Sequence, residues 1–233
     1  MLKQHDAHGF GTLKEKTVHA VMKLYYAPDE DTHEIPIEGF IADIYHEGKI
    51  IEIQNGNFYK MRDKLKAYLP DYDVTIVLPL YDHKWNIWID PDTGEVSKKN
   101  RCRSGTVYNA FPELYRIKPF LNDEHLHFIF PMLDIEEYRL LSGWSRDRKH
   151  GSDRYDRIPV SFGCEYRIDE IRDYLQFIPP ELDDGFTSAD FARAAGISRE
   201  LADVTLNILY FTGNVIRTEK KGRCWLYNIF QDY

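Results

Sequence analysis

Apolar side chains recur at intervals of three and four in two segments near the start of the chain. Residues 12–27 form the first segment, with Thr12 as the expected N-cap, and residues 58–69 form the second. This spacing predicts two amphipathic helices, of which Asn57 caps the second and Pro70 ends it. The basic residues of the second helix are expected to lie largely outside its apolar stripe, and they are Lys60, Arg62, Lys64 and Lys66.

Isoleucine-rich extended segments lie between and after these helices. Residues 35–46 and 49–54 are expected to pair as a β-hairpin around a tight turn at Gly48. Residues 74–80 are mostly apolar, which is typical of a strand buried on both faces, and residues 86–90 predict a further strand. The order of helix, hairpin, helix, strand and strand predicts an α/β fold with a mixed sheet flanked by helices.

The middle of the chain has weaker patterns. A helix is expected over residues 108–117, a strand over residues 125–133 and a short helix over residues 134–141. Residues 143–157 show no hydrophobic period and are rich in charged and small residues. They are therefore expected to form a long loop, and loops of this length are often functional.

The residues after a Pro-Pro pair have a pattern of their own. They contain two short helices separated by a turn at Gly196, followed by two strands around Gly222. Helix, turn, helix and hairpin is the order of a winged-helix domain. The expected organisation is an α/β domain of residues 1–178 followed by a small winged-helix domain of residues 179–233.

Two carboxylates are expected to meet on the predicted hairpin. Asp43 interrupts an apolar run, where a carboxylate is costly unless it is paired or binds a metal. Glu52 alternates with Ile51 and Ile53 along the next strand, so it points to the opposite face from them. The tight turn can bring both carboxylates side by side, and a hard cation such as Mg²⁺ relieves their repulsion. The alternative is that both side chains lie on a solvated face of the sheet.

With these residues the chain resembles the PD-(D/E)XK nuclease superfamily, whose restriction-endonuclease-like core runs helix, strand, strand, strand, helix, strand. That family carries an Asp on the second strand and an acid-x-Lys on the third, matched here by Asp43 and by Glu52, Ile53 and Gln54. The Pro that usually precedes the Asp is absent, and Gln replaces the Lys, as in some restriction endonucleases. Glu15 matches the acidic residue that many members place on the first helix, where it would bind water in the metal's outer sphere.

The resemblance implies a reaction that needs Mg²⁺ or Mn²⁺. Asp43, Glu52 and the carbonyl of Ile53 would hold the cation, which polarises the phosphodiester and lowers the pKa of an attacking water. Gln54 would orient that water, although it lacks the positive charge of Lys. Lys60, on the following helix, is a candidate to supply this charge.

Basic residues gather in three places that are expected to contact nucleic acid. Guanidinium groups match the geometry of phosphate, and aromatic rings such as Trp144 and Tyr155 accept stacked bases. The alternative for residues 143–157 is a solvated loop that its own aspartates neutralise. The expected contacts are Lys98, Lys99, Arg101 and Arg103 in one cluster, Arg146, Arg148, Lys149, Arg154 and Arg157 in the loop, and Lys220, Lys221 and Arg223 in the wing.

Composition limits the class of protein. The 233 residues are 43% hydrophobic and 29% charged, which is ordinary for a globular chain. The net charge of -8 disfavours a polyanionic partner, but residues 96–160 hold 12 Lys+Arg against 9 Asp+Glu, so such a partner is allowed. No apolar run approaches the length of a membrane span, the N-terminus does not resemble a secretory signal, and the three cysteines form no CxxC pair. A cytoplasmic protein that does not bind membranes is therefore expected.

Taken together, these features predict a metal-dependent DNA endonuclease that hydrolyses phosphodiester bonds. The first alternative is a non-catalytic DNA-binding or regulatory protein in which the nuclease fold is degenerate. The second is a protein-interaction component of a defence or repair assembly. Many restriction-type relatives cut as dimers, so a homodimer is an open alternative to a monomer.

Overall fold

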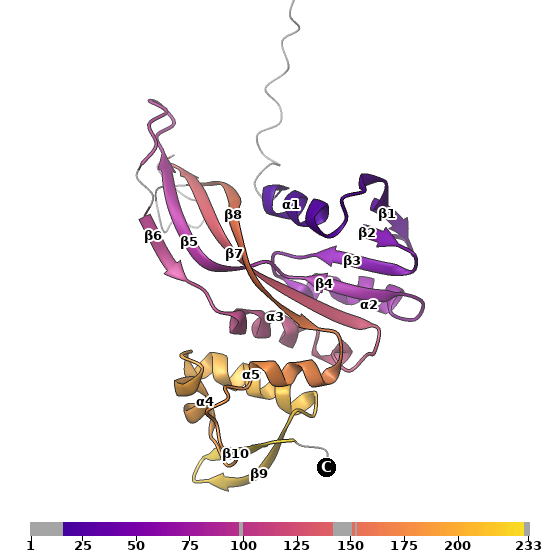
Figure 1. The fold of residues 1–233 in the computed structure, drawn as a ribbon, viewed down its shortest axis with the longest axis vertical. Coiled ribbons are helices and arrows are strands. Elements are labelled where there is room, and N and C mark those ends of the chain that lie inside the picture. Colours follow the sequence, from indigo (N-terminus) through magenta and orange to yellow (C-terminus); the bar gives the residue numbers. More distant parts are fainter. Residues whose placement is uncertain (1–15, 98–99, 142–150, 152, 231–233) are drawn as a thin grey trace, which may run out of the picture. The chain divides into compact units, whose positions relative to one another are not determined.

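The computed structural model describes residues 16–97, 100–141, 151 and 153–230 (Figure 1). Glu15, Lys98, Lys99, Arg146, Arg148 and Lys149, all predicted to be functional, lie outside the described residues. The chain divides into two compact units, and each is described by itself. Unit 1 comprises Met1–Asp31, Pro79–Thr106 and Pro131–Cys164, and unit 2 comprises Thr32–Leu78, Val107–Phe130 and Glu165–Tyr233.

Unit 2 contains a mixed sheet with the strand order β1-β2-β3-β4-β7 (Figure 1). Neighbours are antiparallel from β1 to β3, whereas β3 with β4 and β4 with β7 are parallel. A sheet of this kind with helices packed on it is α/β, which confirms the predicted class. The strands are β1 (His33–Ile37), β2 (Phe40–His46), β3 (Lys49–Ile53), β4 (Asp73–Val77) and β7 (Leu126–Leu140), of which unit 2 takes only the first residues.

The segment predicted as one strand over residues 35–46 is in fact two strands. Glu38 and Gly39 have φ angles of 48° and 78°, so the chain reverses there and β1 pairs with β2. The predicted turn at Glu47 and Gly48 has the same left-handed conformation, with φ angles of 47° and 82°. Two consecutive residues with positive φ form the kind of turn that joins adjacent antiparallel strands.

Helix α2 (Arg62–Tyr68) follows a 3₁₀ turn at Phe58–Met61 and packs on the sheet of unit 2. The rings of Tyr68 and Phe40 meet edge to face with centroids 6.0 Å apart. Asn57 makes no side-chain capping bond, contrary to the prediction. Instead, the Glu113 carboxylate accepts a hydrogen bond of 2.8 Å from the Phe58 N–H, so a distant acidic side chain satisfies this helix start.

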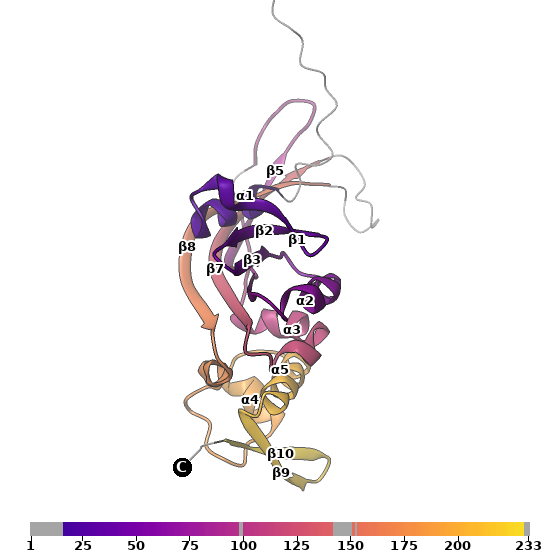
Figure 2. The same cartoon turned by 90° about the vertical axis from the view of Figure 1, so that its right-hand side faces the viewer.

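The C-terminal part of unit 2 follows the predicted order of helix, helix and hairpin. Helix α5 packs against α3 (Figure 2), and Lys118 Nζ donates a hydrogen bond of 2.7 Å to Asn207 of α5. The winged-helix assignment and the boundary between residues 178 and 179 stay predictions. The elements concerned are α3 (Phe111–Arg116), α4 (Ser188–Ala194), α5 (Arg199–Phe211), β9 (Val215–Lys221) and β10 (Cys224–Ile229).

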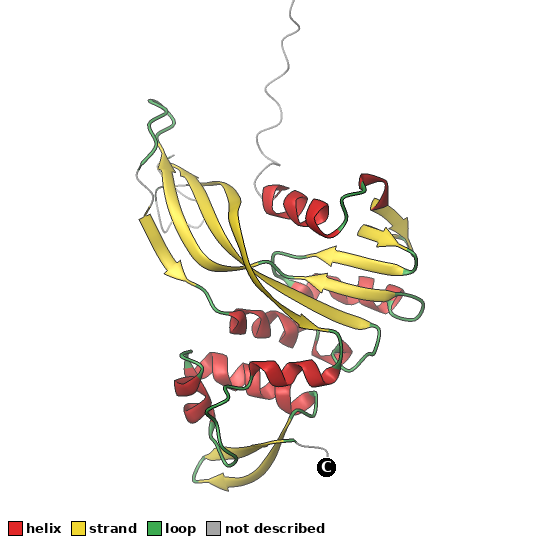
Figure 3. Cartoon of the chain, viewed as in Figure 1, coloured by secondary structure: helices red, strands yellow, loops and turns green. Residues whose placement is uncertain are grey.

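Unit 1 is built on long strands (Figure 3), with the later residues of β7 parallel to β5. β8 also pairs with β7, and β6 is antiparallel to β5. Helix α1 lies beside β8, where the rings of Tyr25 and Phe162 stack with centroids 4.7 Å apart. The elements of unit 1 that have not yet been placed are α1 (Lys16–Tyr26), β5 (Leu80–Ile89), β6 (Asn100–Ser104) and β8 (Asp153–Ile168), of which unit 1 takes the residues up to Cys164.

The helix predicted over residues 134–141 is wrong, because β7 runs to Leu140 and pairs with β5 along this stretch. The loop predicted over residues 143–157 is also wrong in part, because Asp153 begins β8. Strand pairing between distant segments overrides the local sequence pattern in both places. In the described part of the chain no helix is long and apolar enough to cross a membrane.

A half-exposed ion pair joins the starts of two parallel strands in unit 2. Asp73 of β4 and His125, just before β7, lie 2.8 Å apart (Oδ1 to Nδ1). Their hydrogen bond raises the pKa of His125 and lowers the pKa of Asp73. Stability from the raised His125 pKa is fully present below its unfolded value of about 6.5 and is lost as pH rises through the folded pKa. Stability from the lowered Asp73 pKa is present above about 3.9 and is lost as pH falls through the folded pKa.

The pair should therefore stabilise unit 2 more at mildly acidic than at alkaline pH. We expect His125→Asn to lower the melting temperature at a pH between these two limits, and to do so much less at alkaline pH, where wild-type His125 is neutral. Thermal denaturation at both pH values measures the difference, with exposed His46→Asn as the control. An equal decrease at both pH values would contradict a contribution from the charged pair.

Candidate functional site

Asp43 and Glu52 lie on adjacent strands of the hairpin, as their spacing predicts. Ile44 pairs with Ile51, and the same register places Asp43 opposite Glu52. The Asp43 carboxylate accepts a hydrogen bond of 2.8 Å from the backbone N–H of Ile53. Side chains on opposite positions of antiparallel strands share one face of the sheet. Here that face is the one that α2 covers, since Lys64 of α2 contacts Glu52.

Lys64 contacts the carboxylate of Glu52 with its charged end. Its Nζ lies 2.7 Å from Glu52 Oε1 and 2.8 Å from Oε2, and it also donates to the carbonyl oxygen of Ile41 at 2.7 Å. Glu52 is fully buried, whereas the Lys64 side chain is 21% exposed. An ammonium group has three donors, and these contacts use them all. The buried carboxylate is therefore neutralised from α2 and not from its own strand.

Tyr68 follows Lys64 by one helical turn and lies on the same face of α2. Its hydroxyl is buried and makes no hydrogen bond among the residues that the structure describes. Burial, followed by the negative charges of Glu52 and Asp43, raises the pKa of Tyr68 above its ordinary value. The hydroxyl thus stays protonated at neutral pH and offers a donor beside the two carboxylates.

The structure also describes two further residues of the predicted site, Gln54 and Lys60. Gln54 directly follows β3, is half-buried, and donates its backbone N–H to the Val77 carbonyl at 2.8 Å. Lys60 is exposed. The lysine that contacts Glu52 is Lys64, one helical turn later. The three nearby oxygen donors of Asp43, Glu52 and the Ile53 carbonyl are of the type that Mg²⁺ prefers. This donor set suits a hard divalent cation, although such a cation would share Glu52 with Lys64.

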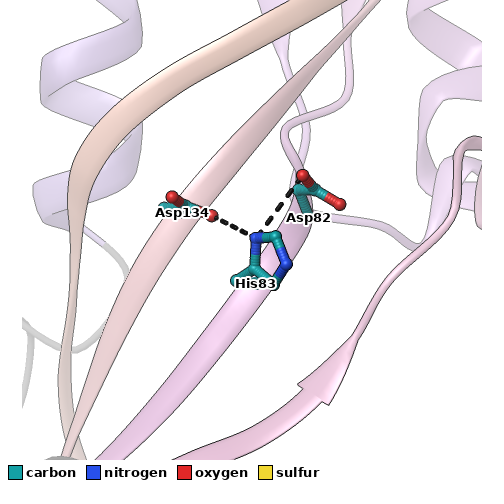
Figure 4. Close-up of side chains that lie close together, drawn as sticks. All are labelled: Asp82, His83 and Asp134. Carbon is teal, nitrogen blue, oxygen red and sulfur yellow. Dashed lines mark hydrogen bonds and ion pairs between the residues drawn. The ribbon is translucent and has the colours of Figure 1, made fainter.

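A second group with metal-binding side chains lies in unit 1 (Figure 4). His83 Nδ1 is 2.9 Å from Asp134 Oδ1 and 3.4 Å from Asp82 Oδ2. The Ser161 hydroxyl donates to the other oxygen of Asp134 at 2.9 Å. Partial burial acts to raise the pKa of Asp134, but the bonds from Ser161 and His83 outweigh it and lower that pKa. The group was missed from the sequence because Asp134 lies on a different strand, with no spacing motif to link it to Asp82 and His83.

Four basic side chains surround the buried carboxylate of Glu137 in unit 1, and we call this group the Glu137 cluster. The distances to the carboxylate oxygens are 2.7 Å from Arg139, 3.0 Å from Arg157, 3.4 Å from Lys84 and 3.5 Å from Arg154. Burial alone would raise the pKa of Glu137, but Lys84, Arg157 and Arg154 lower it to about 2. Arg154 and Arg157 were predicted to contact nucleic acid. Lys84, Arg139 and Glu137 were not singled out.

The other predicted nucleic-acid contacts are dispersed. The backbones of Arg101 and Arg103 belong to β6, where Arg103 pairs with Lys84 of β5. Lys220, Lys221 and Arg223 are exposed around the turn of the β9–β10 hairpin. Lys220 Nζ lies 4.7 Å from the centre of the Trp225 ring, so an aromatic side chain accompanies the basic wing. Their role in binding stays a prediction.

Comparison with known proteins finds a matching family model and a distant relative. A family model described as a domain of unknown function (DUF8091) matches residues 16–169, which is more than half of the chain. An uncharacterized protein from Treponema pallidum (strain Nichols) is 26% identical over 141 residues, covering 59% of this chain and 56% of the relative. The chain thus matches little more than half of the length of that relative. No solved structure shows a significant match to the chain.

Proposed function

This chain belongs to the family described as a domain of unknown function (DUF8091), and we propose that it hydrolyses phosphodiester bonds of DNA with Mg²⁺ or Mn²⁺. The observation that carries the proposal is the group of Asp43, Glu52 and Lys64. Two carboxylates lie on opposite positions of β2 and β3, and a lysine ammonium contacts one of them. These are the charges that a PD-(D/E)XK site combines, with the lysine supplied by α2 in place of β3.

The order of elements supports the same proposal. The three antiparallel strands β1, β2 and β3 are followed by α2 and by β4, which is parallel to β3. The nuclease core that the sequence resembles has this succession of three strands, a helix and a strand. Asp43 and Glu52 occupy the second and third of these strands, where that family places its acidic residues.

Each residue of the group would have a distinct role. Asp43, Glu52 and the Ile53 carbonyl would hold the cation, which when bound supplies Lewis-acid activation of the phosphodiester and of water. Lys64 would hold the Glu52 carboxylate in place and keep a positive charge near the reacting phosphate. Gln54 would orient the attacking water through its amide.

Binding of the cation should be visible as a gain in thermal stability. We expect Mg²⁺ or Mn²⁺ to raise the melting temperature, because a ligand at 100 times its Kd stabilises the folded state by about 2.7 kcal/mol. Asp43→Asn should abolish the shift, since it removes one ligand charge with little change of shape. Asp71→Asn, at an exposed position just after α2, is the matched control and should keep the shift. Equal melting curves with metal and with chelator would contradict the metal site.

A second candidate is a nucleic-acid-binding protein in which the nuclease fold is a scaffold without catalysis. Two observations favour it. Lys64 contacts both oxygens of Glu52, and Gln54 stands where the PD-(D/E)XK pattern has its lysine. An internal ammonium then takes the place of the metal. Binding of nucleic acid without cleavage of duplex DNA, single-stranded DNA or RNA would favour this candidate.

A further inference from the structure

Arg217 of β9 lies among three aromatic rings in the C-terminal part of unit 2. Its guanidinium carbon is 4.5 Å from the ring centre of Tyr210 in α5, and 5.7 Å from the ring centres of Trp225 and Tyr227 in β10. A guanidinium group over the face of an aromatic ring is held there by a cation–π attraction. The three rings therefore fix the position of this cation.

Arg217 forms no ion pair with a carboxylate in the part of the chain that the structure describes, and its buried Nε–H has no hydrogen-bond partner there. Nearby Arg199 of α5 differs, because it pairs with Asp203 at 3.5 Å. A partly buried cation without an ion pair is costly unless an anion approaches it. The guanidinium group of Arg217 thus has an unused capacity to bind an anion.

A β-bulge brings a second cation to the same face of the hairpin. Lys220 pairs with Trp225 and Arg217 pairs with Tyr227, so three steps along β9 match two steps along β10. Residues three apart in a regular strand point to opposite faces, but the extra residue of the bulge puts both cations on the face of the two rings. Lys220 is exposed, and its Nζ lies 4.7 Å from the Trp225 ring centre. Both cations therefore adjoin one indole ring.

Two of the three rings are open to solvent. Trp225 is 37% exposed and Tyr210 is 45% exposed, whereas Tyr227 is buried and supports Arg217 from the interior. Residues 214–230 hold four basic side chains and one acidic side chain, that of Glu219. The hairpin thus presents exposed aromatic rings within a segment of net positive charge.

Helix α5 has a face that is already covered. Lys118, which follows α3, donates a hydrogen bond of 2.7 Å to Asn207 of α5 and lies 4.7 Å from the ring centre of Phe211. A helix that reads duplex DNA has to lay its open face in the major groove. The face of α5 with Asn207 and Phe211 is therefore not available for a groove, which favours the hairpin as the binding surface.

We propose that this hairpin binds single-stranded nucleic acid at the face formed by Arg217, Lys220 and Trp225, with Tyr210 at its border. Arg217 and Lys220 would contact phosphates, since guanidinium and ammonium groups both bind phosphate oxygens. Unpaired bases would stack on the exposed parts of Trp225 and Tyr210. The bases of a duplex are already stacked on each other, so the rings favour a single strand.

The inference goes beyond the proposed function, because it concerns the hairpin and requires no cation at Asp43 and Glu52. Asp43→Asn should leave the Kd for a single strand unchanged in chelator. Hairpin-dependent binding without cleavage would contradict the proposed catalysis alone. Cleavage by a protein whose binding does not depend on the hairpin would contradict this inference alone.

The test is fluorescence anisotropy of the full chain in chelator, with a labelled single-stranded oligonucleotide and a duplex of the same length, over a series of salt concentrations. We expect tighter binding of the single strand. Arg217→Gln should reduce the salt slope by about 0.7, because this is the slope that one phosphate contact to a single strand contributes. Trp225→Leu should raise Kd by about tenfold and leave the slope unchanged, since stacking releases no counterions.

The chain offers a matched control for each variant. Arg193→Gln removes an exposed arginine that pairs with Asp190 and contacts no ring of the hairpin. Tyr115→Leu removes an exposed ring that also lies beside a lysine, 5.7 Å from Lys118 Nζ. Both controls should keep the Kd and the salt slope of the wild type.

Three outcomes would overturn the inference. They are no binding of the single strand by the wild type at low salt, binding of the duplex at least as tight as that of the single strand, and site variants that bind like their controls. If melting curves show that Arg217→Gln or Trp225→Leu is unfolded, Lys220→Gln and Tyr210→Leu replace exposed side chains and carry the same expectations. An unchanged slope in the first and an unchanged Kd in the second would then overturn it.

Discussion

Replacement of Lys64 by methionine should destabilise the protein by about 3 to 5 kcal/mol at neutral pH, because it removes the ammonium group that contacts the buried Glu52 carboxylate. This is a large fraction of the stability of a typical domain, which is about 5 to 15 kcal/mol. The loss of stability comes mainly from the cost of keeping the Glu52 charge away from water, and less from the lost attraction between Glu52 and Lys64. At acidic pH the difference should shrink, because a protonated Glu52 does not require a cation.

Denaturant unfolding measures this change in the free energy of unfolding in four proteins: the wild type, Lys64→Met, Lys60→Met and the Glu52→Gln, Lys64→Met double variant. Lys60→Met is the matched control, since Lys60 lies one turn earlier and is exposed, and it should change stability by no more than about 0.5 kcal/mol. Glu52→Gln combined with Lys64→Met should regain most of the lost stability, because the uncompensated charge is then gone. A Lys64→Met variant as stable as Lys60→Met would show that the Glu52–Lys64 pair does not form as described.

The hairpin and its two carboxylates can be predicted from the sequence because local rules determine them. Alternation along a strand places Glu52 on the face opposite to Ile51 and Ile53, and a two-residue turn sets its register with Asp43. Lys64 is harder to predict, because its place beside the apolar stripe of α2 does not tell whether it points to solvent or reaches under the helix. A long lysine side chain can do either.

Strand β7 was mistaken in part for a helix for a related reason. A charged Glu137 at a buried strand position disrupts the alternation that would have identified the strand. Its burial is tolerated only because cations reach it from Lys84, 53 residues earlier, and Arg157, 20 residues later. Contacts between residues so far apart in the sequence do not produce a local sequence pattern, so the Glu137 cluster can be identified only in the structure.

The second large effect concerns catalysis. If Asp43 and Glu52 hold the metal, then loss of the Glu52 charge should reduce cleavage of DNA by orders of magnitude, because neither Asp43 nor the Ile53 carbonyl can replace the Glu52 carboxylate as a ligand. Glu52→Gln alone would also leave the partly buried Lys64 ammonium without its carboxylate partner, so a destabilised or unfolded protein would give the same result. The combined Glu52→Gln and Lys64→Met variant avoids this ambiguity, because it is expected to fold.

Gln54 provides a second, independent check on the same site. Gln54→Lys would restore the charge that the PD-(D/E)XK pattern has at this position, and it should keep or increase cleavage. The readout is the initial rate of plasmid nicking with Mn²⁺. Loss of all cleavage in a folded Gln54→Lys protein would contradict the assigned role of this position.

The measurement that tests the central claim most directly is cleavage of plasmid and single-stranded DNA by purified wild-type protein with Mg²⁺ or Mn²⁺, compared with Asp43→Asn and with the Glu52→Gln, Lys64→Met double variant. Asp71→Asn and a chelator serve as controls. We predict metal-dependent cleavage by the wild type and by Asp71→Asn, and loss by orders of magnitude in both site variants while they remain folded. Cleavage that persists in the site variants, or a folded wild type that cuts neither substrate with either ion, would contradict it.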